Sequence, residues 1–305
     1  MSGLLRKLGY ACIPLLVLLG LGEGVARLAG AGGMILYPTE GNCQRRSPLL
    51  GEEFRPHCTA KVAGTAFHTN ALGLRDDEVE GDGRRRILAI GDSCTFGWGV
   101  EQAEPYPQAL QALLDDGAQR GRYRVINAGV PGYTSYHGLL YLRERGLALH
   151  PAVVIAGYGF NDIVPAGDVI ASLERQRRMM LLLRLDDALL DSSRLWRWLR
   201  VKTLRPPSPT LPLRSTPVQY GENLREIVEL ARAAGAQPIL LDFFAPNSPQ
   251  REHMAALEAA ARDLGVPLLV YEGPRLDVVH PTREGYREFA AQLRRHLLET
   301  GVLEP

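Results

Sequence analysis

The chain has 305 residues, of which 46 % are hydrophobic and 23 % charged. This composition is close to the globular average and excludes a disordered, collagen-like or wholly membrane-embedded chain. The formal net charge of +1 gives no basic surplus of the kind that a nucleic-acid-binding protein needs, so we predict no nucleic-acid partner. The four cysteines show neither CxxC spacing nor a cluster with histidine, so no metal is predicted, and no cofactor is implied.

Residues 1–35 carry the signals of an export or anchoring segment. Arg6 and Lys7 precede fifteen uncharged, mostly apolar residues that end before Glu23. As a helix this run spans about 22 Å at ~1.5 Å per residue, less than the ~30 Å hydrocarbon core of a bilayer. The segment is therefore a signal anchor, or a signal peptide cleaved near Ala29-Gly30-Ala31. We favour the anchor, because charges directly before a cleavage site are unusual.

Both interpretations place the remaining chain outside the cytoplasm, because a basic flank stays on the inner side. We expect a protein of the cell envelope, attached to the inner membrane through its N-terminal helix and facing the periplasm or the cell exterior. Secretion after signal cleavage is the alternative.

Residues 36–84 are rich in glycine, proline, asparagine and charge, and show little periodicity. They predict an irregular lead-in packed on the following domain, with short strands around residues 60–68. Cys43 and Cys58 lie 15 positions apart in this stretch. An oxidising compartment would let them bridge, and the sequence leaves both the bridged and the free state open.

From residue 85 to residue 305 apolar runs alternate with amphipathic stretches of helical period. The predicted strands are residues 87–90, 125–126, 152–156, 238–243 and 267–270. The predicted helices are residues 106–118, 135–149, 221–234, 251–264 and 283–299. This alternation predicts a three-layer α/β/α domain with a central parallel sheet, which binds ligands beyond the carboxyl ends of its strands.

Residues 163–216 interrupt the alternation. Between residues 174 and 205 nine Arg or Lys stand against four Asp or Glu, interspersed with Leu, Met, Trp196 and Trp198. This basic amphipathic insertion is either a lid or face resting on an anionic membrane or polymer, or a pair of ordinary helices whose apolar stripe docks on the domain. The proline-rich residues 206–217 predict a stiff, exposed linker back to the domain.

Polar residues suited to nucleophilic catalysis follow separate strands. Ser93 stands in a Gly-Asp-Ser turn after the first strand, Gly132 follows the second, and Asn161 follows the third. Asp277 and His280, three residues apart, precede the last helix, so that the carboxylate can orient the imidazole and the imidazole can reach the serine. Each feature alone is typical of an ordinary turn, whereas all of them on one rim predict an active site.

These four blocks resemble the SGNH subgroup of the GDSL esterase and lipase family, whose blocks supply Ser, Gly, Asn and His in this chain order. The resemblance covers about residues 65–298. It includes residues 67–75, which are similar to the lead-in of exported, often membrane-anchored bacterial members. It implies a flavodoxin-like hydrolase fold for the domain of residues 85–305.

The resemblance also implies a role for each site residue. Ser93 would be the nucleophile, His280 its base and Asp277 the partner of that base. The amide of Ser93, Gly132 and Asn161 would form the oxyanion hole. A further cysteine, Cys94, directly follows the nucleophile and would place a reactive thiol beside it.

The activity so implied is hydrolysis of a carboxylic ester through an acyl-Ser93 intermediate. The partner would be an acylated small molecule, an envelope glycan or a lipid. Two alternatives stay open: acyl transfer to a sugar hydroxyl by the same residues, and a non-catalytic envelope protein that binds glycans. The sequence gives no prediction of oligomeric state.

Overall fold

A five-stranded parallel sheet forms the centre of the protein. The structure is a computed structural model that describes residues 2–31, 39–40, 43–79, 81, 83–203, 210–244 and 250–303. The strand order in the sheet is β10-β9-β8-β6-β7, with all neighbours parallel. The strands are β6 (Arg85–Gly91), β7 (Tyr123–Gly129), β8 (Pro151–Gly157), β9 (Gln237–Asp242) and β10 (Leu268–Val270). Each lies where the sequence predicts a strand, and the predicted α/β class is confirmed.

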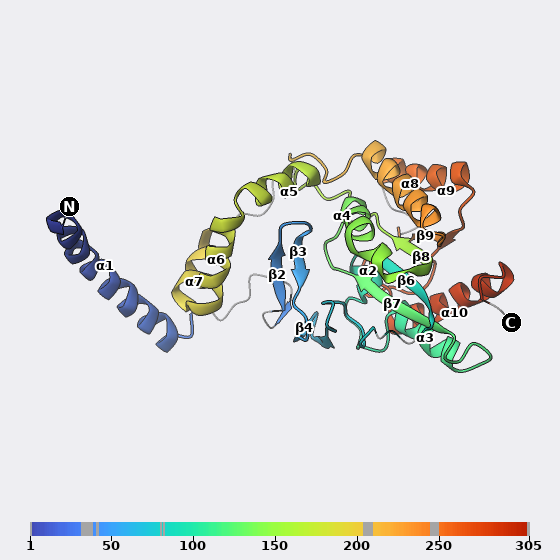
Figure 1. Cartoon of the computed structure of the whole chain (residues 1–305), viewed down its shortest axis with the longest axis horizontal. Coiled ribbons are helices and arrows are strands. Elements are labelled where there is room, and N and C mark those ends of the chain that lie inside the picture. Colours follow the sequence, from blue (N-terminus) through green and yellow to red (C-terminus); the bar gives the residue numbers. More distant parts are fainter. Residues whose placement is uncertain are drawn as a thin grey trace.

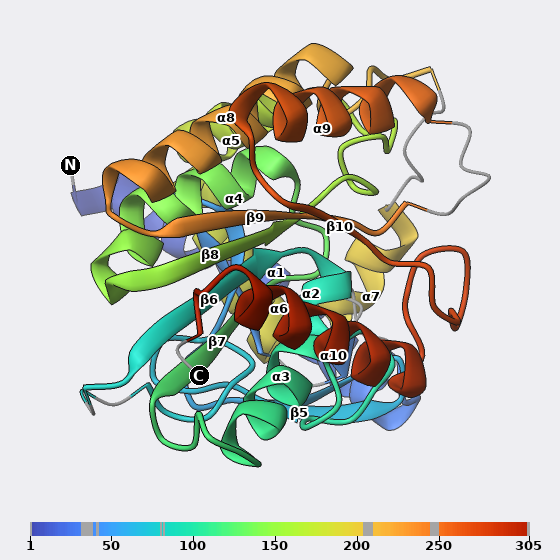
Figure 2. The same ribbon diagram turned by 90° about the vertical axis from the view of Figure 1, so that its right-hand side faces the viewer.

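Helices cover both faces of this sheet (Figure 2). One face carries α4 (Ser135–Tyr141), α8 (Pro217–Ala233) and α9 (Arg251–Leu264). The other carries α3 (Tyr106–Asp115) and α10 (Arg283–Glu299). Because side chains alternate across a strand, β6 feeds both cores: Leu88 and Ile90 belong to one apolar cluster, and Ile87 and Ala89 to the other. Burial on both faces explains why the strands read as continuous apolar runs.

The predicted helix of residues 135–149 is regular only in its first half. After α4 the chain continues as a wider π turn, Leu142–Gly146, and a tighter 3-10 turn, Leu147–Leu149. The strand β8 then begins at Pro151. The helical period therefore holds along the segment, although its hydrogen-bond pattern changes.

The lead-in contains more strand than its sequence predicts. An antiparallel sheet of β1 (Thr39–Glu40), β4 (Thr59–Val62) and β5 (Thr65–His68) includes the predicted stretch. An additional hairpin pairs β2 (Gln44–Ser47) with β3 (Gly51–Phe54). The sequence of β2, Gln-Arg-Arg-Ser, has no apolar alternation, and the hairpin is held instead by pairing, by an Arg45–Glu53 ion pair of 2.9 Å and by the buried Phe54 ring.

A disulfide joins Cys43 to Cys58, with their Cα atoms 5.6 Å apart. It ties the start of the β2–β3 hairpin to the start of β4. Phe54 and Phe67 then pack on Phe96 of the central domain, with ring centroids 5.4 and 5.1 Å from it. The lead-in is thus fixed to the domain close to the carboxyl end of β6.

The N-terminal segment forms one helix, α1 (Ser2–Leu28), at the end of the molecule opposite the C-terminus (Figure 1). The predicted N-terminal helix is therefore present. Within the described part of the chain, no helix combines the length and the apolarity needed to cross a bilayer. The membrane anchor and the location in the envelope stay predictions.

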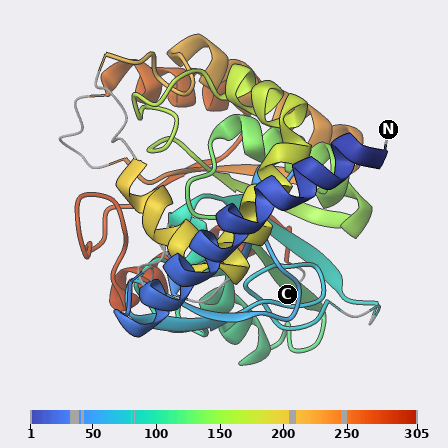
Figure 3. The same cartoon turned by 90° about the vertical axis from the view of Figure 1, so that its left-hand side faces the viewer.

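The insertion forms three helices, α5 (Val169–Arg178), α6 (Met180–Ser192) and α7 (Arg194–Thr203). They lie beside the β2–β3 hairpin. Seen from the end of the molecule that carries α1, this helix crosses in front of α6 and α7 (Figure 3). Of the two interpretations of the insertion, docking of an apolar stripe on the domain does not describe Leu181, Leu182 and Leu185 of α6, which are all exposed. Residues 206–209 of the predicted linker lie outside the described residues.

Candidate active site

The turn that presents Ser93 is built from close backbone contacts. The helix α2 (Ser93–Phe96) starts directly after β6, and the Asp92 carboxylate caps it by accepting a hydrogen bond of 2.9 Å from the Cys94 amide. Glycine at position 129 lets α2 sit on the end of β7, since a Cβ there would lie 2.3 Å from the Phe96 nitrogen. The Ser93 hydroxyl is held at the carboxyl edge of the sheet, with only 8 % of the residue exposed.

Arg75 fixes the other end of this turn. Its guanidinium donates to the carbonyl oxygens of Phe96, Gly97 and Val100, which no helix partner satisfies, and it lies 4.8 Å from the centre of the Phe96 ring. Burial lowers the pKa of Arg75 to about 10, which leaves it charged at neutral pH. A residue of the lead-in therefore positions the loop that follows the nucleophile.

Ser93, His280 and Asp277 meet in one chain of hydrogen bonds. The Ser93 Oγ lies 2.8 Å from His280 Nε2, and His280 Nδ1 lies 2.7 Å from Asp277 Oδ2. With the Nδ1 proton donated to the carboxylate, Nε2 is free to accept the hydroxyl proton. Trp98 stacks on the imidazole, with ring centroids 5.5 Å apart and planes 21° from parallel. Two residues from the far end of the chain are thereby brought to the serine.

The Asp277 carboxylate stays ionised against the imidazole. Partial burial acts to raise its pKa, but hydrogen bonds from the His280 ring and from the amides of His280 and Val279 outweigh this and hold the pKa below its usual value. Both amide contacts measure 2.8 Å and go to Oδ1, which leaves Oδ2 for the ring. An ionised, oriented carboxylate is what stabilises an imidazolium.

Gly132 and Asn161 lie on the same rim. Gly132 has a φ of +85°, a conformation that favours glycine, and its carbonyl accepts a hydrogen bond of 2.7 Å from Arg214 Nη1. The Asn161 amide nitrogen donates to the Tyr133 carbonyl at 3.0 Å and to Asp92 Oδ2 at 3.3 Å. The two N–H bonds of this amide thus have partners, of which Asp92 is the more distant.

Asp92 is itself an unusual group. Burial raises its pKa to about 7, with a smaller contribution of the same sign from Asp162, while the Cys94 amide acts in the opposite direction. Near neutral pH the carboxyl therefore exchanges a proton easily. Its charge state affects the strength with which it holds Asn161.

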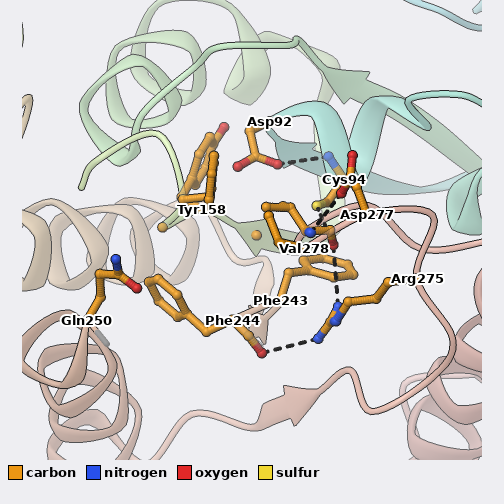
Figure 4. A pocket seen from close by; sticks show the side chains of 13 residues that line it. Asp92, Cys94, Tyr158, Phe243, Phe244, Gln250, Arg275, Asp277 and Val278 are labelled. Carbon is orange, nitrogen blue, oxygen red and sulfur yellow. Dashed lines mark hydrogen bonds between the residues drawn. The ribbon is translucent and has the colours of Figure 1, made fainter. Parts of the chain in front are cut away.

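A cavity of about 570 Å³ opens beside the nucleophile (Figure 4). Its wall includes Asp92, Cys94 and Asp277, the neighbours of Ser93 in chain and in space. The remaining wall is largely aromatic and apolar: Tyr158, Phe160, Phe243, Phe244, Val278 and Val279. Such a volume and lining are typical of a pocket for an apolar ligand.

Cys94 does not have the reactive thiol that its position suggests. Its side chain is buried, and burial raises the pKa of the thiol well above its usual value. The nearby Asp92 carboxylate acts in the same direction. Because the thiolate is the reactive form, we assign this residue to packing beneath the nucleophile and in the wall of the cavity.

Three neighbours of the site were not singled out from the sequence: Arg75, Trp98 and Arg214. Trp98 stands five residues after Ser93, so an aromatic side chain in the nucleophile loop was an available signal. Arg214 lies in the proline-rich stretch that reads as a linker, which gave no such signal.

No described group of three or more His, Cys, Asp or Glu side chains is arranged to hold a metal ion. The residues at the rim are instead an alcohol, an imidazole, a carboxylate and several N–H donors. This set can carry out acyl transfer through a covalent intermediate.

Comparison with known proteins agrees with this chemistry. The sequence model of the GDSL-like lipase/acylhydrolase family matches residues 89–288. Esterase TesA of Pseudomonas aeruginosa is 35 % identical over 77 residues, which cover 25 % of this chain and 37 % of that esterase. The matched region is thus well under half the length of that relative.

Solved structures with a similar course of the chain include the crystal structure of TesA, with 22 % identity, a TM-score of 0.48 and coverage of 70 % of this chain and 98 % of that one. The psychrotrophic esterase EstA from Pseudoalteromonas sp., in a structure inhibited by monoethylphosphonate, gives 18 % identity and a TM-score of 0.46, and covers 72 % of this chain and 98 % of its own.

Proposed function

This chain belongs to the GDSL-like lipase/acylhydrolase family, and we propose that it hydrolyses esters of apolar acyl groups through an acyl-Ser93 intermediate. The observation that carries the proposal is the continuous contact from the Ser93 hydroxyl through His280 to Asp277, at 2.8 and 2.7 Å. An alcohol becomes a nucleophile at neutral pH when a base stands within hydrogen-bond reach and a third group orients that base.

In the first step Ser93 Oγ attacks the ester carbonyl carbon while His280 Nε2 takes its proton. The resulting imidazolium is stabilised by the Asp277 carboxylate through Nδ1. The negative charge on the carbonyl oxygen is held by the amides of Ser93 and Gly132 and by the Asn161 side chain. For Asn161 this requires an exchange of its longer contact, the one with Asp92, for the substrate oxygen.

In the second step His280 returns the proton to the leaving alcohol, which departs and leaves the acyl group on Ser93. A water molecule then gives a proton to His280 and attacks the acyl carbonyl, and the acid is released as the serine regains its proton. The same groups serve both halves of the reaction. Arg214 binds the Gly132 carbonyl and so holds the peptide unit between Gly132 and Tyr133, next to the unit that carries the Gly132 amide.

The cavity beside Ser93 favours a substrate with an acyl chain longer than acetyl. Phe243, Phe244 and Val278 line a space of about 570 Å³, more than an acetyl group fills. Each additional CH₂ buried there contributes about 0.8 kcal/mol, equivalent to a factor of up to about four in kcat/KM. We propose lipid-like or acylated envelope esters as the substrate class.

We also propose that the enzyme works outside the cytoplasm. The Cys43–Cys58 bridge supports this location, because disulfides persist in oxidising compartments and are rare in the cytosol. The bridge lies in the lead-in, which contacts the catalytic domain through Phe54 and Phe67.

The test is a series of nitrophenyl esters from acetyl to decanoyl, with the full chain and its Ser93→Ala variant. We expect kcat/KM to rise with chain length until the cavity is full, and turnover by the variant to fall on the order of 10⁶-fold. Phe244→Ala should reduce turnover of the long esters while leaving the acetyl ester little changed. Labelling by a serine-directed phosphonate, located by peptide mass spectrometry, should fall on Ser93.

Activity that survives in the Ser93→Ala variant, or a phosphonate bound elsewhere, would contradict the proposed mechanism. An optimum at acetyl would contradict the proposed substrate class alone. Product analysis in the presence of a sugar acceptor separates hydrolysis, which releases the free acid, from acyl transfer, which yields the acylated sugar.

A further inference from the structure

The helix α6 exposes apolar side chains to solvent, which is the reverse of the usual arrangement in the domain that carries it. Leu181, Leu185 and Leu189 are spaced by four residues and share one face of the helix, and they are 75 %, 55 % and 43 % exposed. Leu182, next to this row, is 61 % exposed. A helix that packs its apolar stripe on a core in water shows the opposite arrangement.

Two acidic residues of α6, Asp186 and Asp187, face inward. Asp187 accepts a hydrogen bond of 2.8 Å from Arg46 on β2. Asp186 accepts bonds from the Trp196 indole at 2.7 Å and from Arg200 at 3.1 Å, both on α7. Charged groups thus hold the hairpin of α6 and α7 to itself and to the lead-in, while the leucines are left outside.

The same reversal occurs where α1 meets α7. Glu23 of α1 accepts bonds from the amides of Arg194 and Leu195, at 3.1 and 3.0 Å, which are free donors at the start of α7. Arg27 binds Glu23 and the Ser192 carbonyl. The charges of this part of α1 are therefore turned toward α7.

Between residues 13 and 21 of α1, apolar side chains are exposed. Leu16, Leu18 and Leu21 are each more than 60 % exposed. The helix α1 lies at the same end of the molecule as α6 and α7 (Figures 1 and 3). On α7, Trp198 and Leu199 are also exposed. We call the exposed apolar side chains of α1, α6 and α7 the outer face.

We propose that the outer face lies in the interfacial region of an anionic lipid bilayer. Apolar side chains outside and paired charges inside are the arrangement that an apolar medium stabilises. Burying the leucines in the boundary between headgroups and acyl chains removes their surface from water, at about 25 cal/mol per Å².

The charge of the insertion identifies the kind of surface. Residues 174–205 contain nine basic and four acidic residues, a surplus of five positive charges. Arg184 and Lys202 are exposed, and a negatively charged headgroup layer attracts such residues. A second copy would instead bring an equal positive surplus against the first, which opposes a symmetric dimer through this face.

Vesicle partitioning of the full chain tests the proposal. The vesicles contain either phosphatidylcholine alone or equal parts of phosphatidylcholine and phosphatidylglycerol. The test variant is Leu181→Gln with Leu185→Gln, and the matched control is Leu72→Gln with Val218→Gln, two exposed apolar residues outside the outer face. A charge variant, Arg184→Glu with Lys202→Glu, isolates the electrostatic part. All variants are compared for turnover of a soluble ester, which should not change.

We expect the leucine variant to bind both vesicles about tenfold more weakly or worse, and the control to bind like the parent. The charge variant should lose the preference for phosphatidylglycerol and keep the weaker binding to phosphatidylcholine. Brominated lipids should quench the fluorescence of the parent more than that of Trp198→Phe.

Binding of the leucine variant within twofold of the parent would overturn the proposal, because the leucines of α6 that define the outer face would then not enter the bilayer. Sedimentation that shows a dimer for the parent and a monomer for the leucine variant would also overturn it, since a second copy would then cover the outer face. Neither outcome bears on the ester hydrolysis proposed above, which is measured on soluble substrate.

Discussion

The rim of the sheet and the outer face arrange their polar and apolar side chains in opposite ways. At the rim, polar groups turn toward one another above an apolar interior: Ser93 contacts His280, His280 contacts Asp277, and Arg75 binds backbone oxygens. On α6 the carboxylates of Asp186 and Asp187 turn inward, and Leu181, Leu182 and Leu185 lie outside. The comparison agrees with contact of the first region with water and substrate, and with the proposal that the second region meets an apolar medium.

The two regions also differ in how they are held. Around Ser93 the chain is fixed by contacts that admit little displacement, such as the approach of Gly129 to the Phe96 nitrogen. The hairpin of α6 and α7 is fixed to the lead-in by side-chain contacts near its surface, such as that of Arg46 with Asp187. The preceding helix α5 is held in a similar way, because Arg177 donates to the Pro48 carbonyl. Substitutions should therefore affect turnover and stability strongly at the rim and weakly on the outer face.

After removal of the nucleophile itself, the largest effect is expected for Asp277→Asn. The asparagine amide would donate to His280 Nδ1 and so favour the tautomer that carries its proton on Nε2, which cannot accept the Ser93 proton. We expect kcat to fall on the order of 10³- to 10⁴-fold with little change in the free energy of unfolding. Steady-state kinetics on a soluble nitrophenyl ester measures it, with Glu272→Gln as an exposed acidic control. A variant that retained a tenth of the parent turnover would remove Asp277 from the proposed triad.

Next in size is the loss expected for Arg75→Met. The methionine fills part of the space but leaves the Gly97 and Val100 carbonyls without the guanidinium donor, and the Phe96 carbonyl with only the 3.5 Å contact from the Asn127 side-chain amide. Buried groups left unpaired cost about 1 to 3 kcal/mol each, partly relieved by relaxation, so we expect unfolding by urea to show a loss of about 3 kcal/mol. Arg120→Met, an exposed position, is the control. Equal stability of both variants would show that the turn after Ser93 does not depend on this guanidinium.

The sequence predicts the rim better than the rest. The strands of the sheet are buried on both faces, so continuous apolar runs identify them in the sequence. Because the strands are parallel, the residues that follow each strand lie at the same edge of the sheet. That geometry brings Ser93 and Asn161 together without further information. It could not place Arg214, because its approach to the Gly132 carbonyl depends on the path of a segment with no periodic pattern.

The outer face shows a second limit of sequence analysis. A row of leucines at helical spacing defines a face of α6, but the same spacing suits a helix docked on a core and a helix that meets lipid. The spacing of Leu181 and Leu185 alone does not distinguish these two cases. The inward contacts of Asp186 and Asp187 do, because they place the leucines on the opposite, exposed side of the helix. Likewise the charged strand β2 carries no pattern of its own, since it is defined by its partner β3.

A smaller effect should appear in the pH dependence of stability. His137 is buried, packs on Tyr133 with ring centroids 4.8 Å apart and bonds to Thr134. Burial lowers its pKa from 6.5 to about 3, with a like contribution from Arg214. The unfolded chain binds this proton between pH 6.5 and 3 and the folded chain does not, so stability from this residue is complete above pH 6.5 and is lost as the pH falls.

We therefore expect the difference in unfolding free energy between the parent and His137→Gln to shrink by about 2 kcal/mol from pH 7 to pH 5. Urea unfolding at both pH values measures it. The two proteins are compared by difference because Asp92 also affects the pH dependence of stability. Burial raises the pKa of Asp92 to about 7, so its contribution to stability falls as the pH rises, and it does so equally in both proteins. A difference that is independent of pH would show that the imidazole is protonated in the folded state, contrary to its buried setting.

The smallest effect is expected on the outer face, where it tests directly whether the leucines of α6 are exposed in solution. Leu185 is 55 % exposed and Leu190, on the same helix, is 8 % exposed. In water Leu185→Gln should change the protection of α6 amides against hydrogen exchange by no more than about 0.5 kcal/mol, because leucine and glutamine have similar helix propensity and no core contact is lost. Leu190→Gln should lower that protection by about 2 kcal/mol. If both substitutions lowered it equally, the row of leucines would be buried in solution, and the reversal of polarity that separates this helix from the rim would not exist.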